Sequence, residues 1–223
     1  MADDAAVDLA AVVFDLDGVL IDSEQVWDEV RRAVVAERGG RWTDAATGAM
    51  QGMSTPEWCR YLVDELGVAG SPEQVAAEVI RRMAEHYRRH VPLLPGAVDA
   101  VRTLSERWPL GVASSSPPDL IRTVLDVAGI ADRFRVVVSS EQVSGGKPAP
   151  DVYLAAAAQL GVPAGRCVAV EDSANGLRSA AAAGMTVVAV PNPHYPPPDD
   201  ALRLAAVVVD TVAEVTPELL ASL

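Results

Sequence analysis

Short apolar runs alternate with helical patterns along the chain, and this alternation limits the possible folds more than any other feature. Six runs rich in valine and alanine have the character of buried strands. They are Ala11–Phe14, Leu110–Ala113, Val136–Val138, Cys167–Val170, Thr186–Val190 and Ala206–Val209. Helical patterns lie between them, at Gly96–Arg107, Asp119–Ala128, Asp151–Leu160 and Ala174–Ala183. This order predicts a parallel sheet with crossover helices, and therefore a doubly wound, Rossmann-like α/β core.

A long helical segment separates the first two predicted strands. From Ser23 to about Val91 the pattern is purely helical, which is too long for a single crossover. Two stretches inside it have the pattern of helix-capping boxes, Ser54-Thr55-Pro56-Glu57 and Ser71-Pro72-Glu73-Gln74. We predict a small α-helical cap domain at residues 23–91, inserted into a core made of residues 1–22 and 92–223.

The charge balance excludes one large class of partners. The chain has 18 Lys and Arg against 31 Asp and Glu, a net charge of −13. A nucleic-acid-binding protein draws its affinity largely from cations that neutralise phosphates, so we expect no nucleic-acid partner. An acidic protein that binds an anionic phosphate needs a local positive element, such as a metal ion, a lysine or a helix N-terminus.

The cysteines and the hydropathy of the chain indicate the cellular compartment in which we expect the protein. Cys59 and Cys167 are far apart and lack metal-ligand spacing, so we expect two buried, reduced thiols. Residues 1–10 contain three Asp and no Lys or Arg, unlike the basic start of a signal peptide. No apolar run approaches the roughly 20 residues that cross a bilayer. We therefore expect a cytoplasmic protein with no membrane partner, and we expect a monomer because nothing in the sequence demands a partner chain.

Polar side chains follow four of the predicted strands, at the point where each strand ends. Ligands of doubly wound proteins bind beyond the carboxyl ends of the strands, so these side chains are the candidates for a functional site. They are Asp15 and Asp17 after the first strand, Ser114, Ser115 and Ser116 after the second, Lys147 in the loop after the third, and Glu171 and Asp172 after the fourth.

The four carboxylates in this set suit a magnesium site. Magnesium prefers hard oxygen ligands and usually takes a few carboxylates together with water and substrate phosphate. Asp15, Asp172 and Glu171 can supply such oxygens, alongside the backbone carbonyl of Asp17. We therefore predict that Mg²⁺ is the cofactor.

The remaining side chains suit a phosphoryl group. Catalysis of phosphoryl transfer is mostly positioning and stabilisation of negative charge. Lys147 is a point charge suited to a phosphate, and Ser114, Ser115 and loop amides can donate to the other oxygens. A carboxylate such as Asp15 can attack phosphorus directly and form an aspartyl-phosphate.

Four ordered segments resemble the motifs of the haloacid dehalogenase superfamily. They are Asp15-Leu-Asp-Gly-Val-Leu, Val112-Ala-Ser-Ser-Ser, Gly146-Lys-Pro-Ala-Pro-Asp and Val170-Glu-Asp-Ser-Ala-Asn-Gly. The match spans essentially the whole core, and the helical insertion is similar to the small cap of the β-phosphoglucomutase-like branch. The resemblance implies that Asp172 binds magnesium and that Glu171 binds or orients it.

The same resemblance implies catalytic roles. Asp15 would be the nucleophile, and Asp17 would protonate the leaving oxygen and then activate water. Ser114 and Lys147 would hold the phosphoryl oxygens. Together these roles describe a magnesium-dependent phosphatase that hydrolyses a small phosphomonoester, a sugar phosphate, through an aspartyl-phosphate intermediate.

Two alternatives stay open within and beyond the superfamily. Mutases similar to β-phosphoglucomutase carry a histidine and an arginine in the cap at positions that correspond to Trp27 and Thr55, so these residues favour a phosphatase over a phosphomutase. Asp22-Ser23-Glu24 followed by Trp27 looks more like the sugar-phosphate phosphatases, and Glu24 and Trp27 are candidate specificity residues. A phospho-accepting signalling domain also combines acids, a hydroxyl and a lysine, but its acceptor aspartate follows a later strand and it lacks a helical insertion.

Overall fold

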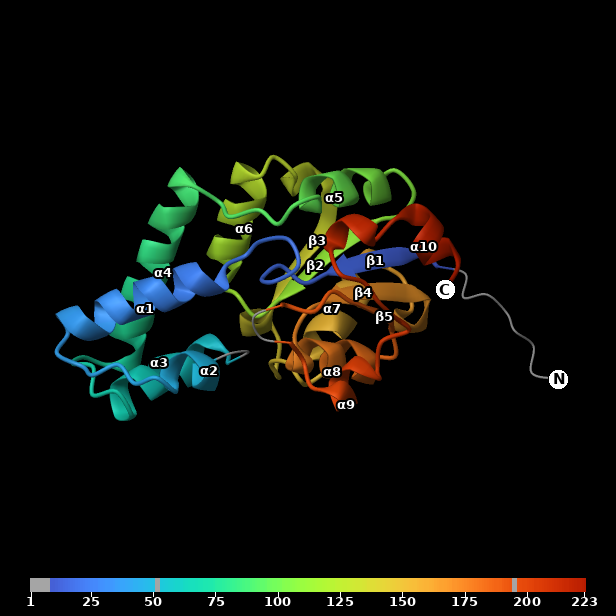
Figure 1. The fold of residues 1–223 in the computed structure, drawn as a ribbon. Coiled ribbons are helices and arrows are strands. Elements are labelled where there is room, and N and C mark those ends of the chain that lie inside the picture. The colour runs from blue at the N-terminus through green and yellow to red at the C-terminus, as the bar shows by residue number, and fades with distance from the viewer. Residues whose placement is uncertain (1–8, 51–52, 194–195) are drawn as a thin grey trace.

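The computed structural model describes residues 9–50, 53–193 and 196–223, and its centre is one parallel sheet (Figure 1). The strand order is β3-β2-β1-β4-β5-β6, with every neighbouring pair parallel. The strands are β1 (Ala11–Phe14), β2 (Leu110–Ser114), β3 (Phe134–Ser139), β4 (Cys167–Glu171), β5 (Thr186–Ala189) and β6 (Val207–Val208). All six predicted strands and the doubly wound arrangement are therefore confirmed, with β3 longer and β6 shorter than expected.

Helices cover both faces of the sheet, α5 and α6 on one and α7 and α8 on the other (Figure 1). Their bounds are α5 (Ala97–Ser105), α6 (Pro118–Val127), α7 (Asp151–Leu160) and α8 (Ala174–Ala182), followed by the short α9 (Asp199–Leu202) and α10 (Pro217–Ala221). Side chains of β1 alternate between the two layers: Val12 and Phe14 join one apolar cluster, and Ala11 and Val13 join the other. Because both faces of the central strands β1, β2 and β4 are buried, these strands are apolar on both sides, whereas the edge strand β3 alternates and exposes Arg135 and Val137.

Between β1 and α5, where the cap was predicted, the described residues form four helices. They are α1 (Glu24–Glu37), α2 (Ala46–Met50), α3 (Thr55–Asp64) and α4 (Pro72–Arg89). Both predicted capping boxes are present, at the start of α3 and of α4. Helix α4 packs against α1 and α3, and the group lies beyond the carboxyl ends of the strands (Figure 1). Its separation as a domain at residues 23–91 stays a prediction.

The two chain segments that join these helices to the core run side by side. The backbone N–H of Asp22 donates to the carbonyl of Pro92 at 2.8 Å, and that of Leu94 donates to Leu20 at 3.0 Å. Ile21 and Leu93 form an antiparallel bridge between these two segments. The helices therefore enter and leave the core through one hydrogen-bonded pair of strand-like segments.

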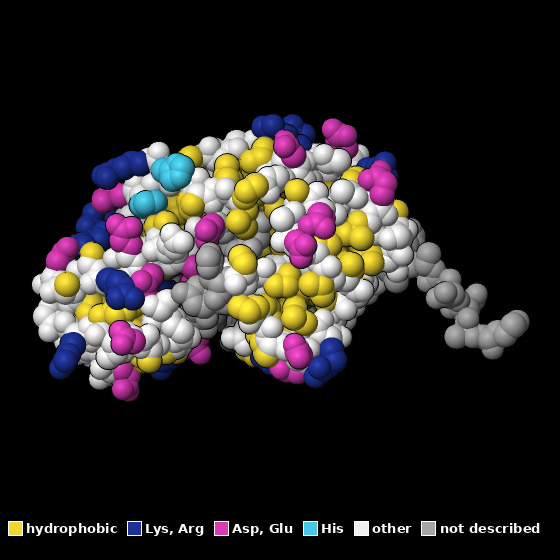
Figure 2. Space-filling model, in the orientation of Figure 1, with side chains coloured by type: hydrophobic (Ala, Val, Ile, Leu, Met, Phe, Trp, Pro, Cys, Tyr) yellow, Lys and Arg dark blue, Asp and Glu magenta, His cyan; other side chains and the backbone are white. Residues whose placement is uncertain are grey.

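The surface of the helical segment carries charges of both signs (Figure 2). On α4, Arg82 lies 2.6 Å from Glu78 and 2.5 Å from Glu37 of α1, and Arg81 also pairs with Glu78. Exposed pairs of this kind contribute little individually, on the order of 0–1 kcal/mol each. They compensate the surface charges locally, so the net acidity of the chain is not concentrated there.

Three smaller expectations concern the rest of the chain. Cys59 and Cys167 are both free and buried, as predicted. Of the helices in the described ranges, none is long and apolar enough to pass through a bilayer. Residues 1–8, which make up most of the acidic N-terminal stretch, lie outside the described residues.

Candidate active site

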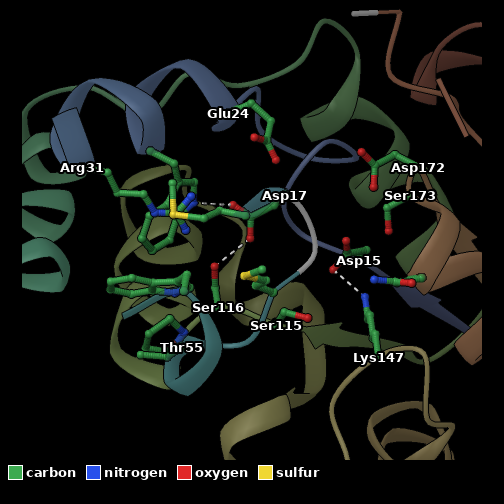
Figure 3. Close-up of a pocket in the computed structure, with 16 residues that line it drawn as sticks. Asp15, Asp17, Glu24, Arg31, Thr55, Ser115, Ser116, Lys147, Asp172 and Ser173 are labelled. Atoms are coloured by element: carbon green, nitrogen blue, oxygen red, sulfur yellow. Dashed lines mark hydrogen bonds and ion pairs between the residues drawn. The ribbon is translucent and has the colours of Figure 1, made fainter. Parts of the chain in front are cut away.

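A cleft of about 700 Å³, its open mouth included, lies where the carboxyl ends of the strands face α1 and α3 (Figure 3). The core contributes Asp15, Asp17, Ser115, Ser116, Lys147 and Asp172 to its lining, and the helical segment contributes Glu24, Trp27, Arg31, Thr55 and Trp58. All four motif-bearing strand ends therefore meet around one space. The topology explains why, since β1 sits between β2 and β4 at the point where the strand order reverses.

Three carboxylates crowd together at the core end of the cleft. Asp15, Glu171 and Asp172 each offer an oxygen within 4.8 Å of the other two. The pairing of β1 with β4 sets this arrangement, because Phe14 and Val170 are partners and the Asp15 N–H donates to the Val170 carbonyl at 2.9 Å. The residues that follow each strand are consequently held side by side.

Lys147 is the cation of this cluster (Figure 3). Its Nζ atom lies 3.0 Å from Asp15 Oδ1 and 2.5 Å from Glu171 Oε1, and its side chain is buried. Burial alone lowers the pKa of a lysine, but the attraction of Asp15 and Glu171 raises the pKa of Lys147 above its ordinary value. The ammonium group is therefore fixed in its charged form beside Asp15.

Glu171 is completely buried, and both of its carboxylate oxygens already accept hydrogen bonds. Tyr153 Oη donates to Oε1 at 2.9 Å, beside the Lys147 contact. The backbone N–H groups of Asp172 and Ser173 donate to Oε2 at 2.9 and 3.1 Å. The first turn of α8 also passes close by, since a Cβ at Gly176 would lie 1.7 Å from Oε1. This carboxylate is thus held rigidly and orients Lys147.

One ammonium group does not balance three buried carboxylates. Burial, reinforced by Glu171 and Asp17, raises the pKa of Asp15 to about 8 although Lys147 opposes the shift. Burial and the charges of Glu171 and Asp15 likewise raise the pKa of Asp172 well above its ordinary value. Asp15 Oδ1 is buried and accepts no hydrogen bond of good geometry, so its contact with Lys147 is an ion pair. These residues fit a divalent cation, which would supply the missing positive charge.

Asp17 accepts hydrogen bonds from two sides of the cleft. Ser23 Oγ and Trp27 Nε1 donate to its Oδ1 at 2.5 and 3.3 Å. Ser116 Oγ donates to Oδ2 at 2.7 Å, and Ser114 Oγ is 3.4 Å from the same oxygen. The carboxylate therefore connects the core loop after β2 with the start of α1.

Most of the predicted site residues line the cleft, and two lie behind its lining. Seven of them line it: Asp15, Asp17, Glu24, Trp27, Ser115, Lys147 and Asp172. Ser114 and Glu171 lie behind this lining, where both are completely buried. Ser114 directs its hydroxyl towards Asp17 and also accepts from the Ser116 N–H at 3.0 Å.

The sequence did not reveal three residues of the site. Arg31 and Trp58 line the cleft, and Tyr153 holds Glu171 from behind. Ser116, a candidate through its place in the serine run after β2, also lines the cleft. Arg31, Trp58 and Tyr153 lie within helices, where the spacing of the residues does not reveal which face points to a ligand.

Comparison with known proteins agrees with this geometry. The family model of the haloacid dehalogenase-like hydrolases matches residues 9–184, and the chain belongs to this family. It is 34% identical to hexitol phosphatase B of Escherichia coli K12 over 218 residues, which cover 93% of this chain and 95% of that protein. It is also 30% identical to the E. coli fructose-1-phosphate phosphatase YqaB over 181 residues, which cover 81% and 96% of the two chains.

A solved structure shows the same fold. The structure of CbbY from Rhodobacter sphaeroides in complex with phosphate is similar with a TM-score of 0.85, covering 96% of this chain and all of that one. The two chains are 23% identical, so this likeness concerns the fold alone. The predicted superfamily and the hydrolase class are confirmed.

Proposed function

We propose that the protein is a magnesium-dependent phosphatase that hydrolyses a sugar phosphate or a similar small phosphomonoester. The observation that carries this proposal is the buried cluster of Asp15, Lys147 and Asp172 at the end of an otherwise open cleft. Such a cluster offers a nucleophile, a phosphate-binding cation and metal ligands in one place. Relatives named as phosphatases for hexitol phosphates and fructose 1-phosphate support the substrate class.

In this proposal Asp15 attacks the phosphorus atom through a carboxylate oxygen. The new bond from oxygen to phosphorus forms an aspartyl-phosphate, and the ester bond to the sugar oxygen breaks. Asp17 gives its proton to that leaving oxygen. Water then attacks the phosphorus of the intermediate while Asp17 takes up a proton, which releases inorganic phosphate and restores Asp15.

The surrounding residues bind and orient. Lys147 holds a phosphoryl oxygen and offsets the charge of Asp15, while Glu171 keeps Lys147 in place. Ser115 at the cleft surface donates to another phosphoryl oxygen. Asp15 and Asp172 would hold the magnesium ion, together with the Asp17 carbonyl, and the ion would neutralise charge on the phosphoryl group. Because both oxygens of Glu171 are occupied, we assign it an orienting role rather than direct ligation.

A phosphomutase is the competing activity. A mutase would return the phosphoryl group to another hydroxyl of the sugar instead of transferring it to water. Trp27 disfavours this alternative. Mutases similar to β-phosphoglucomutase carry a histidine at this position, whereas here the indole of Trp27 contacts Asp17. An indole N–H donates a hydrogen bond but does not exchange protons as an imidazole does.

Phosphate release from a panel of phosphorylated hexoses and hexitols tests the proposal. With Mg²⁺ present we expect free phosphate in amounts equal to the dephosphorylated sugar, and no release from the Asp15→Asn variant. A thermal melt of that variant establishes that it is folded. Undiminished activity of Asp15→Asn would overturn the proposal, and isomerised sugar phosphate without free phosphate would replace it with the mutase.

A further inference from the structure

The end of the cleft remote from the acidic cluster contains a second cation besides Lys147, the guanidinium of Arg31. Arg31 of α1 lies with its guanidinium carbon 4.6 Å from the ring centre of Trp27 and 5.0 Å from that of Trp58. Its Nε is buried without a hydrogen-bond partner. Within the described ranges Arg31 makes no hydrogen bond or ion pair to another side chain or to the backbone. Two indole rings therefore hold a cation whose donors remain available.

The two indole rings stabilise the guanidinium but leave its N–H donors without a partner. Cation–π contacts recover on the order of 0.5–2 kcal/mol each, and an unpaired buried polar group costs on the order of 1–3 kcal/mol, so the two contributions roughly cancel. Burial lowers the pKa of Arg31 to about 10, opposed mainly by Glu24 and Asp17, so the guanidinium stays charged at neutral pH. A ligand that accepts hydrogen bonds would satisfy it.

An available acceptor lies on the same helix face. Glu24, Trp27 and Arg31 are spaced i, i+3 and i+7 along α1, so all three face the cleft. Figure 3 shows the side chains of Glu24 and Arg31 extending towards the space around Asp17. The Glu24 carboxylate has no hydrogen bond or ion pair with any residue in the described part of the chain. The helix thus presents one unsatisfied donor group and one unsatisfied acceptor group to the same space.

We propose that Arg31 and Glu24 bind hydroxyl groups of the substrate's leaving group and select uncharged polyhydroxylated phosphomonoesters. A hydroxyl accepts a hydrogen bond from the guanidinium and donates one to the carboxylate, so it satisfies both residues. A second anion would pair with Arg31 but would face Glu24 and the acidic lining near Asp17, where like charges repel. This inference rests on the proposed phosphatase function and adds the part of the substrate that α1 recognises.

Two substrates that differ in one group provide the test. Sorbitol 6-phosphate and 6-phosphogluconate share their carbon chain, but C1 is a CH₂OH group in the first and a carboxylate in the second. We expect the unaltered protein to have a kcat/KM about tenfold or more higher for sorbitol 6-phosphate. p-Nitrophenyl phosphate, whose leaving group has no other hydroxyl, serves as the reference substrate.

Variants at the two positions separate recognition from chemistry. Arg31→Met should lower kcat/KM for sorbitol 6-phosphate by about 10- to 100-fold more than for p-nitrophenyl phosphate, the effect of losing hydrogen bonds from a charged group. Glu24→Gln removes the negative charge and should therefore reduce the difference in kcat/KM between sorbitol 6-phosphate and 6-phosphogluconate. Arg32→Met is the matched control, because Arg32 is exposed beside Trp42 and pairs with Asp28 outside the cleft.

The outcomes are distinct. A preference of the unaltered protein for 6-phosphogluconate, or hydrolysis of p-nitrophenyl phosphate alone, would overturn the inference and leave the phosphatase function standing. Equal losses on sorbitol 6-phosphate and p-nitrophenyl phosphate in Arg31→Met would assign Arg31 a structural role. If Arg31→Met does not fold, Arg31→Lys keeps the charge without the planar fork and should show the same selective loss to a smaller degree. No Asp15-dependent release from any of the three substrates would contradict the phosphatase function itself.

Discussion

Trp27 Nε1 donates a 3.3 Å hydrogen bond to Asp17 Oδ1, and the same indole ring supports the guanidinium of Arg31. One side chain of α1 therefore touches both the carboxylate proposed as acid and base and the cation proposed to bind the leaving group. In the proposed mechanism, recognition of the sugar and placement of the proton donor therefore both depend on Trp27.

Replacing Trp27 by Phe tests this connection. The variant keeps an aromatic ring under Arg31 but loses the donor to Asp17, and we expect kcat to fall by about 3- to 10-fold for the loss of one long hydrogen bond. Steady-state kinetics on the best sugar phosphate measure the change. Trp42→Phe is the control, because Trp42 also contacts an arginine but its Nε1 has no hydrogen-bond partner among the residues that the structure describes. Equal effects of the two substitutions would contradict a role for the Trp27 donor.

Replacing Lys147 by Met should remove the phosphate-binding cation while preserving much of the side-chain volume. By comparison with a lost oxyanion donor, we expect a loss of about 3–4 kcal/mol in transition-state stabilisation, seen in kcat/KM. Removing this cation also takes away the attraction that opposes the upward shift of the Asp15 pKa, so Asp15 should hold its proton to higher pH. A variant with near-normal kcat/KM would remove Lys147 from the proposed mechanism.

Gly18 brings the main chain close to Asp172, one of the proposed metal ligands. Its φ is 78°, and a Cβ there would lie 1.9 Å from Asp172 Oδ2. We expect Gly18→Ala to displace Asp172, to weaken Mg²⁺ activation and to cost more than the roughly 1–2 kcal/mol of a left-handed alanine. Gly39→Ala is the control: its φ is 74°, but none of the described residues outside its immediate neighbours places an atom within 4 Å of the added carbon. Titration calorimetry with Mg²⁺ and thermal melts of both variants separate the collision from backbone strain.

The raised pKa of Asp15 predicts how metal binding depends on pH. Metal ligands must be deprotonated, so Mg²⁺ should displace a proton and bind more tightly as pH rises towards about 8. Calorimetry in buffers of different ionisation enthalpy measures the released proton. Asp15→Asn should bind Mg²⁺ more weakly and should lose the contribution of Asp15 to the proton release.

The same shift predicts the stability of the metal-free protein. Because the pKa is higher in the folded state than its ordinary value of 3.8, the folded state binds more protons between these values. The contribution of Asp15 to the free energy of unfolding should therefore decline as pH rises from about 4 to about 8. Mg²⁺ should consequently raise the Tm more at pH 8 than at pH 6. A larger increase at pH 6 would show that burial does not govern this carboxyl group.

Much of the core was predictable because its signals are local. The apolar runs identified all six strands, and Gly129, Gly161 and Gly184 adopt the positive φ that is common for a glycine just after a helix. The parallel arrangement then required Asp15, Lys147 and Asp172 to meet at one edge. Strand polarity alone brings residues together that are more than 100 positions apart in the sequence.

The helix-borne part of the site was not predictable in the same way. Arg31 and Trp58 lie on faces whose direction depends on how α1 and α3 pack, and Tyr153 has the pattern of an ordinary core residue. The sequence also left open which serine of the run 114–116 contacts Asp17. Strand β2 ends at Ser114, and the turn that follows brings the Ser116 hydroxyl closer to Asp17 Oδ2 (2.7 Å) than the Ser114 hydroxyl (3.4 Å).

Lys147 is also the only lysine among the 223 residues, since the other 17 basic side chains are arginines. An amine-acylating reagent therefore finds a single ε-amino group in the chain, and that group lies buried between Asp15 and Glu171. The α-amino group reacts with the same reagents, so acylation of the peptide that contains Lys147, measured by mass spectrometry after digestion, reports access to the candidate catalytic centre. No engineered probe is needed to follow when that centre opens or when a phosphate ligand shields it.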